Sequence, residues 1–287
     1  MKVYRLILAL LLLCSGVIFN SCKKDDPSIP DILIVADRAN GKIYQVNLST
    51  GALTELAQVM LSSSGLGEIR GMVYNPSNQT LYATSTNDGS GKLYSINPTT
   101  AVANQINGDP SDYWYGLPDI KLTSDNKLLA TVWHKAAGPT GDYGPGLIKF
   151  NLDGSVAQAL LFNTTDPAGI DMCCGFGLTF GDSQTELLIA SSENDFPDIY
   201  SSTLSGSVTY EATLTLQGFT VSDQYMTIKN LVKFSGKTYA LVFGYDDELT
   251  YLAELDLVNN KLIQIAKLSA TNSVQYNGLA VIAGNLF

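Results

Sequence analysis

The feature that most constrains this chain is a β-rich unit that recurs five times between residues 31 and 287. Each unit contains a hairpin of two apolar strands joined by a short turn rich in Asn, Asp, Gly or Ser. The five hairpins are YQVNLSTGALTEL, YSINPTTAVANQI, IKFNLDGSVAQAL, YSSTLSGSVTYEA and LAELDLVNNKLIQI. Such turn residues supply the positive φ angles that tight hairpins need. Helical periodicity is almost absent over the same residues, so the sequence predicts an all-β fold.

Two further strands complete each unit. The strand before each hairpin begins at Ile32, Leu81, Leu128, Glu186 or Thr238. These starts are about 50 residues apart, and four strands in a repeat of that length are typical of a propeller blade. The candidates for the innermost strands are Arg70–Asn75, Leu117–Thr123, Gly175–Gly181, Ile228–Ser235 and Asn277–Gly284.

The order of the strands predicts how the ring closes. The first unit lacks an innermost strand, whereas the chain ends on an innermost strand without a unit. Asn277–Gly284 is therefore expected to complete the N-terminal blade and to remove an exposed sheet edge. We expect a β-propeller of five four-stranded blades; six blades remain the alternative if the longer third or fourth unit holds an extra hairpin. The repeats resemble those of YVTN, NHL and quinoprotein-like propellers over nearly all of residues 31–287, which implies architecture alone.

The start of the chain has the pattern of an export signal. Lys2 and Arg5 precede an apolar run, Leu6 to Phe19, that is too short to span a bilayer comfortably and that ends shortly before Cys22. This pattern resembles the signals of Bacteroidetes-type surface lipoproteins, and the charged residues Lys23 to Asp26 resemble their surface-export signal.

That resemblance implies a domain plan and a location. Residues 1–21 are expected to be a signal peptide that is removed, and Cys22 is expected to carry the lipid. Residues 22–30 then form a tether, and residues 31–287 form a single propeller domain. The protein would be anchored to the outer membrane, and it would face the cell surface if the charged residues Lys23 to Asp26 act as a surface-export signal. An ordinary cleaved signal peptide or an uncleaved anchor are the alternatives, and all three export the domain.

The composition excludes several classes of function. The 287 residues contain 17 basic and 27 acidic side chains, a net charge of −10, which opposes nucleic-acid binding. One histidine, His134, excludes zinc sites built from several histidines. The sequence contains no GxSxG, HExxH, P-loop or GxGxxG motif, so we expect neither a cofactor nor a metal.

The candidate ligand site lies on one predicted face. In a propeller, the loops entering the innermost strands and those joining the second and third strands share a face over the central channel. These loops hold aromatic and charged residues, whereas the opposite turns are plainer. The residues expected to bind ligand are Arg70, Tyr113, Trp114, Tyr115, His134, Lys229 and Tyr276. Aromatic rings stack on sugars and apolar ligands, and Arg70 and Lys229 suit a carboxylate or phosphate, although pairing with Glu68 and Asp119 would also explain them.

Cys173 and Cys174 are adjacent, and they are the remaining thiols once Cys22 is acylated. In an oxidising compartment they are a possible vicinal disulfide, which would be strained; two reduced thiols are the alternative.

These observations favour a monomeric, envelope-anchored propeller that binds a glycan or a protein partner without catalysis. The alternative is an exported carbohydrate-active hydrolase or lyase that uses a pair of carboxylates. The candidate acids are Asp37, Asp119, Asp171, Glu193 and Asp246. A purely structural role in assembly is a third possibility.

Overall fold

The computed structural model describes residues 30–85, 91–106, 114–132, 134–135, 145–162, 177–183, 185–191, 197–219, 225–269 and 274–287, with the backbone alone at 114–115, 134–135 and 161. The chain divides into two units, Met1–Pro30 and Asp31–Phe287, and the description below concerns the second. In the described residues every regular element is a strand, and none is a helix of the length and apolar character needed to cross a membrane.

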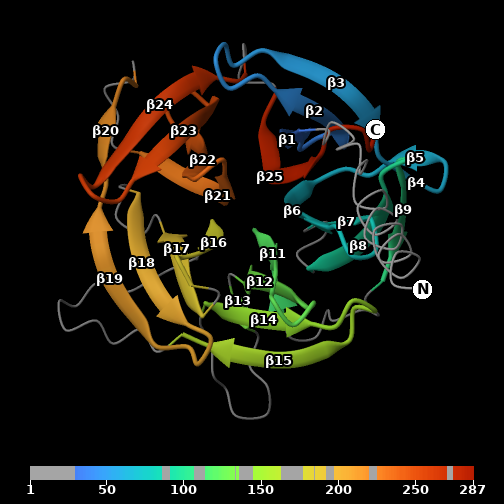
Figure 1. The fold of residues 1–287 in the computed structure, drawn as a ribbon, viewed down its shortest axis with the longest axis horizontal. Helices are drawn as coiled ribbons and strands as arrows, with labels where there is room; N and C mark the ends of the chain where they lie inside the picture. Colours follow the sequence, from blue (N-terminus) through green and yellow to red (C-terminus); the bar gives the residue numbers. More distant parts are fainter. Residues whose placement is uncertain are drawn as a thin grey trace, which may run out of the picture. The chain divides into compact units, whose positions relative to one another are not determined.

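Five sheets surround a common axis as the blades of a propeller (Figure 1). Blade 1 contains β25 (Tyr276–Ala283), β1 (Asp31–Asp37), β2 (Lys42–Val46) and β3 (Leu53–Gln58). Blade 2 contains β6 (Ile69–Asn75), β7 (Thr80–Ser85), β8 (Lys92–Asn97), β9 (Val102–Gln105), β4 (Met60–Leu61) and β5 (Ser64–Gly65). Blade 3 contains β11 (Ile120–Leu122), β12 (Leu128–Val132), β14 (Gly146–Phe150) and β15 (Val156–Leu161).

Blade 4 contains β16 (Leu178–Phe180), β17 (Glu186–Ser191), β18 (Asp198–Thr203) and β19 (Val208–Thr213). Blade 5 contains β21 (Met226–Phe234), β22 (Lys237–Gly244), β23 (Thr250–Asp256), β24 (Lys261–Lys267) and β20 (Thr215–Gln217). A separate two-stranded ladder joins β10 (Trp114–Tyr115) to β13 (His134–Lys135). The prediction of five blades is confirmed.

The predicted ring closure is also confirmed. The last strand, β25, pairs antiparallel with the first strand, β1, from Asp31 opposite Ala283 to Asp37 opposite Tyr276. Figure 1 shows the red C-terminal strand beside the blue N-terminal strands at the inner edge of blade 1. The last strand of the chain therefore supplies the hydrogen-bonding partner for the inner edge of the first blade.

The hairpin turns form because short polar side chains bond to their own backbone. Asn47 Oδ1 accepts from the N–H groups of Ser49 and Thr50, and Asn97 Oδ1 accepts in the same way from Thr99 and Thr100. These are Asx turns, which compete with continuation of the strand. The Asn-rich turns of the repeat therefore end one strand and start the next.

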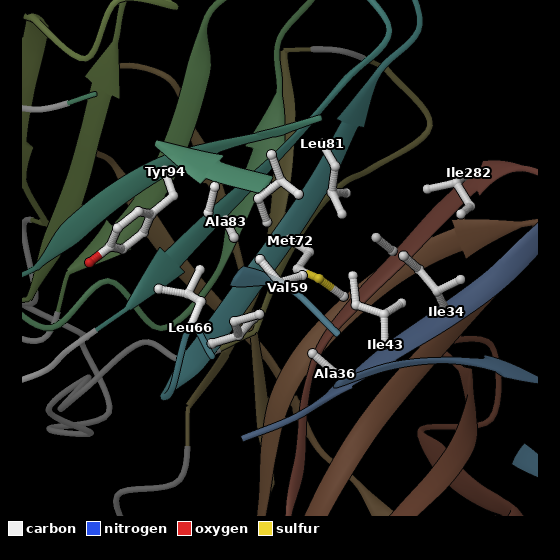
Figure 2. Close-up of a cluster of buried hydrophobic side chains, with 14 residues drawn as sticks. Ile34, Ala36, Ile43, Val59, Leu66, Met72, Leu81, Ala83, Tyr94 and Ile282 are labelled. Carbon is white, nitrogen blue, oxygen red and sulfur yellow. The ribbon is translucent and has the colours of Figure 1, made fainter. Parts of the chain in front are cut away.

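The core lies between blades, because each sheet buries both of its faces against its neighbours. The second strands are consequently apolar without alternation, and every residue of β12 is buried. Figure 2 shows the cluster between blades 1 and 2, where Ile34 and Ile43 pack beside Met72 and Leu81. Burial of such side chains supplies the main driving force for keeping adjacent blades together.

Two linkers between blades add strands that the repeat did not predict. Leaving blade 1, β4 runs parallel to β9 on the outer edge of blade 2, with Met60 opposite Val102. Leaving blade 4, β20 runs parallel to β24 on the outer edge of blade 5, with Thr215 opposite Lys261. Each linker therefore covers the outer edge of the blade that follows it.

Candidate ligand-binding face

One residue in or directly before each inner strand contacts another inner strand, and these five residues define one level of the propeller. The residues at this level are Gly71, Asp119, Gly177, Asn230 and Gly278. The space between the strands explains the glycines. A Cβ atom on Gly71 would lie 2.7 Å from the Cα of Asp119, and a Cβ on Gly177 would lie 3.2 Å from the carbonyl carbon of Asn230. Strands carrying larger side chains could not approach the axis so closely.

Asp119 joins three blades at this level, and its side chain is completely buried. Its Oδ1 accepts from the backbone N–H of Ile120 at 2.8 Å and from Nζ of Lys121 at 2.6 Å. Its Oδ2 accepts from the N–H of Leu178 in blade 4 at 2.9 Å and of Leu231 in blade 5 at 3.2 Å. Burial raises the pKa of Asp119, while the Lys121 ammonium and the backbone donors counteract that rise. Asp119 therefore has a structural role at the axis.

Asn230 makes the complementary set of bonds. Its Nδ2 donates to the carbonyl oxygens of Arg70 at 3.0 Å and Pro118 at 3.3 Å, and its Oδ1 accepts from the N–H of Gly278 at 2.9 Å. Asn230 thus connects blade 5 to blades 2, 3 and 1. Together with Asp119 it links all five inner strands, and both residues are completely buried.

Immediately beside this level, two inner strands bulge. The register of β6 against β7 shifts between Ile69 and Met72, and the register of β21 against β22 shifts between Ile228 and Asn230. The residues inside these bulges include Arg70 and Lys229. A bulge leaves a residue outside the regular alternation and re-aims its side chain. Both predicted site residues therefore lie in a β-bulge of an inner strand.

Arg70 belongs to a connected polar cluster on the face where chains enter the inner strands. Glu68 bridges two guanidinium groups, with its Oε2 3.3 Å from Arg70 and its Oε1 3.4 Å from Arg38. Arg38 also donates to Oε1 of Gln275 at 2.7 Å. Arg38 follows β1, Glu68 precedes β6 and Gln275 precedes β25, so blades 1 and 2 build this cluster jointly.

Lys229 brings blade 5 to the same cluster. Its Nζ lies 5.4 Å from the ring centroids of both Phe243 and Tyr245, which is within the range of cation–π attraction. Burial, together with the charges of Arg70 and Arg38, lowers the pKa of Lys229 to about 7. Burial and the charge of Arg38 likewise lower the pKa of Arg70, while Glu68 opposes this shift. Three cations from three blades therefore interact electrostatically.

Of the residues expected to bind ligand, Arg70 and Lys229 are thus brought together. Tyr276 lies at the start of β25 and is 8% exposed. Its ring meets Tyr44 edge-on at 5.7 Å, and burial raises its pKa to about 12. Tyr276 therefore packs at the junction of blades 5 and 1, and its contact with a ligand stays a prediction.

The aromatic triplet and the loop histidine are placed in part. The backbone of Trp114 pairs with that of Lys135, and the backbone of Tyr115 pairs with that of His134. The two predicted loops are therefore adjacent. Tyr113 lies outside the described residues, as do Cys22 and the Cys173–Cys174 pair, so their roles stay predictions.

Sequence reasoning named Arg70 and Lys229 and gave Glu68 as a possible partner, which the structure confirms for Arg70, but it did not predict the association with Arg38, Gln275, Phe243 and Tyr245. Arg38 and Tyr245 directly follow second strands, Glu68 and Gln275 precede inner strands, and Phe243 lies near the end of β22. Their positions at the ends of strands on one face were visible in the repeat. Their association was not, because it depends on contacts between different blades.

The described carboxylates do not form a cluster of acids. The two oxygens of Asp37 accept from Ala39 N–H and from Asn40 Nδ2 in a local turn, and Asp119 is held at the axis. Asp246 is exposed. Asp171 and Glu193 lie outside the described residues. Over the described ranges no group of three or more His, Cys, Asp or Glu residues could hold a metal ion.

A cavity of about 450 Å³ lies on the opposite face, near the turns of blade 2. Its walls carry amides and hydroxyls but no charged side chain. The lining residues are Asn78, Gln79, Thr80, Tyr82, Ser95, Ile96, Asn97, Pro98, Thr99, Asn104, Ile106, Leu152 and Leu286. The prediction that the opposite turns are plainer describes their chemistry correctly, but it missed this hollow.

Comparison with known proteins separates fold from family. No family model matches the sequence, and no curated protein matches it. Among solved structures, a chain of the nidogen/laminin complex has a TM-score of 0.57 and 12% identity, covering 88% of this chain and 98% of that one. The likeness is one of fold.

A second solved structure, the periplasmic gluconolactonase of Pseudomonas aeruginosa, has a TM-score of 0.47 and 12% identity. It covers 83% of this chain and 82% of its own length. The β-propeller architecture therefore rests on the strand pairing and on the first of these likenesses. The resemblance to YVTN, NHL and quinoprotein-like repeats stays a prediction.

Proposed function

We propose that this chain is an envelope lipoprotein, anchored through Cys22 and exported, whose propeller binds a glycan or protein ligand without catalysis. The binding face is the one that holds Arg38, Arg70 and Lys229. The observation that carries this proposal is the electrostatic coupling of three basic side chains from three blades, of which Lys229 lies beside Phe243 and Tyr245. Charged groups with strongly shifted pKa values at one end of a scaffold are typical of functional sites.

The fold supports the same choice. Asp119 and Asn230 hold all five inner strands together, so loops on this face rest on a rigid base. A propeller of this general kind occurs in the nidogen/laminin complex, which is an assembly of proteins. Binding by loops on a rigid scaffold is a common arrangement.

The binding proposal is tested with the protein produced from the complete chain on a panel of immobilised glycans and envelope proteins. Tyr245 is 49% exposed beside Lys229, so Tyr245→Ala should weaken binding about tenfold or more if this face is used. Val258→Ala is the control, because Val258 is 92% exposed in the β23–β24 turn on the opposite face. Equal loss with both variants, or with neither, would contradict the proposal.

The same panel decides the alternative. A carbohydrate-active hydrolase or lyase would release reducing sugar or unsaturated product from a glycan, whereas a binding protein would leave the glycan intact. The anchor is tested separately. Cys22→Ser should abolish incorporation of a labelled fatty acid and release the protein from the membrane fraction; membrane retention without label would favour an uncleaved anchor instead.

A further inference from the structure

The cations near the axis stand out against the charge of the whole chain. The protein carries a net charge of −10, yet Arg38 and Arg70 share the carboxylate of Glu68, and Lys229 interacts electrostatically with both arginines. Both Arg70 and Lys229 have pKa values lowered by burial and by neighbouring cations. An anion placed beside these three side chains would be attracted to all three positive charges.

We propose that Arg38, Arg70 and Lys229 bind the carboxylate of an acidic saccharide, a hexuronic acid unit. This inference rests on the proposed ligand-binding face and specifies which glycan it takes. A guanidinium group matches a planar carboxylate through two parallel hydrogen bonds, and an ammonium adds a point charge. Glu68 and Gln275 hold Arg38 in place, so that this guanidinium is oriented before a ligand arrives.

The aromatic neighbours favour a sugar as the carrier of that carboxylate. Phe243 is 9% exposed and meets Tyr245 edge-on at 5.3 Å, whereas half of Tyr245 faces solvent. Phe243 therefore fixes the orientation of a ring that is itself accessible. An amphipathic ring stacks on the apolar face of a pyranose while its hydroxyl stays wet. A carboxylate bound at the cations would place the attached sugar beside Tyr245.

The charge of the whole chain favours a small acidic glycan over a polyanion. A long polyanion would extend beyond the cluster and meet a protein surface of net negative charge, which repels it. A short uronate meets the local cations first. Long-range repulsion is also screened beyond about 8–10 Å at physiological salt.

Binding should be coupled to a proton. Lys229 faces Arg70 on β6, Arg38 after β1, and Phe243 and Tyr245 at the end of β22, and Glu68 holds both arginines. A carboxylate beside Lys229 favours its charged form, so the ligand should raise the proton occupancy of this amine near pH 7.5. Because the charged form binds the anion, affinity should fall as the pH rises from 7 to 9.

The test is calorimetric titration of the protein, produced from the complete chain, with α-1,4-linked tri-galacturonic acid and with the matching neutral galactotriose. We expect the acidic trisaccharide to bind at least tenfold more tightly. Arg70→Gln and Lys229→Met should each remove that preference. Lys267→Met, on the outer strand β24, is the matched control and should retain it. Titration at pH 7.5 in HEPES and in Tris should reveal net proton uptake with the acidic ligand that Lys229→Met lacks.

Several results would overturn the inference. Equal affinity for the acidic and neutral trisaccharides would do so, and so would an unchanged preference in folded Arg70→Gln protein. Competition by inorganic phosphate at the same concentration as the uronate would show a site for phosphate groups rather than for an acidic sugar. Failure of both trisaccharides to bind would also refute it, while the Tyr245→Ala comparison would still decide whether this face binds another ligand.

Discussion

At the scale of single residues, the inner strands combine small size with polarity. Three glycines let the strands approach, and Asp119 and Asn230 together bond to the backbone of all five blades. The sequence predicted the inner strands, and Asp119 was considered there as an acid or as a partner of Arg70 or Lys229. Its ion pair is with the neighbouring Lys121, and its partners in other blades are the backbone N–H groups of Leu178 and Leu231, which lie so far along the chain that no local pattern could have identified them.

Asp119→Asn should destabilise the protein strongly, by about 3–5 kcal/mol. The amide N–H₂ would face backbone N–H groups that now donate hydrogen bonds to the carboxylate, and Lys121 would lose its counter-charge. Urea unfolding measures the change. The same substitution at Asp182, whose carboxylate is fully exposed, should leave the midpoint almost unchanged. A small effect at Asp119 would contradict the bonding described at the axis.

Lys229→Met should stabilise the protein by about 1–3 kcal/mol at pH 7 while weakening ligand binding, since it removes a buried amine beside two arginines. The folded-state pKa of Lys229 is about 7, below its usual 10.5, so the unfolded chain binds the proton more tightly. Lys229 therefore lowers the free energy of unfolding most at and below pH 7, and this destabilisation disappears as the pH approaches 10.5. The gap in unfolding free energy between the two proteins should narrow from pH 7 to pH 10, and a constant gap would contradict this account.

At the scale of elements, the second strands were predicted best and the linkers worst. The second strands are mainly apolar, with a few buried Thr and Ser residues, because both of their faces are buried, and this composition is visible in the sequence. The linker strands β4 and β20 contain two and three residues and pair with strands that come later in the chain. Such short segments carry no periodicity, so only the fold shows them. The bulges that aim Arg70 and Lys229 are similarly set by pairing.

Gly71→Ala should force β6 and β11 apart, because its new Cβ would lie 2.7 Å from the backbone of Asp119. Crowding of this kind costs about 1–3 kcal/mol. Thermal unfolding measures the loss. Gly236→Ala is an informative control, since Gly236 has a φ of +77° but nothing within 4 Å of the added Cβ. It should cost about 1 kcal/mol through backbone strain alone and leave ligand affinity intact; a milder effect at Gly71 than at Gly236 would contradict the close approach.

At the scale of the whole molecule, the repeat was enough to give the number of blades and the place where the ring closes. It was also enough to predict which ends of the strands share a face. It could not show that Asn230 bonds to other blades near the axis, or that the charges of Arg38 and Arg70 act on Lys229. Both features depend on contacts between different blades. The likeness to the nidogen/laminin chain, at 12% identity, shows that the architecture persists when most of the sequence differs.

Deleting residues 276–287 should abolish cooperative folding, because β1 would lose its inner partner and blade 1 would expose an unpaired edge. The expected readouts are a broadened thermal transition and aggregation, seen by circular dichroism and light scattering. A synthetic peptide of residues 276–287, added during refolding, should restore the sharp transition. Cooperative unfolding of the truncated chain without the peptide would contradict the role assigned to this strand.

The pairing of β1 with β25 also imposes an order in time. The first strand to leave the ribosome needs the last one as its partner, and the two are separated by more of the sequence than any other pair of adjacent strands in the propeller. Blade 1 therefore stays incomplete throughout synthesis, whichever blades have formed after it. The ring can close only after Tyr276–Ala283 has been synthesised, so the last strand determines when folding of the propeller is complete.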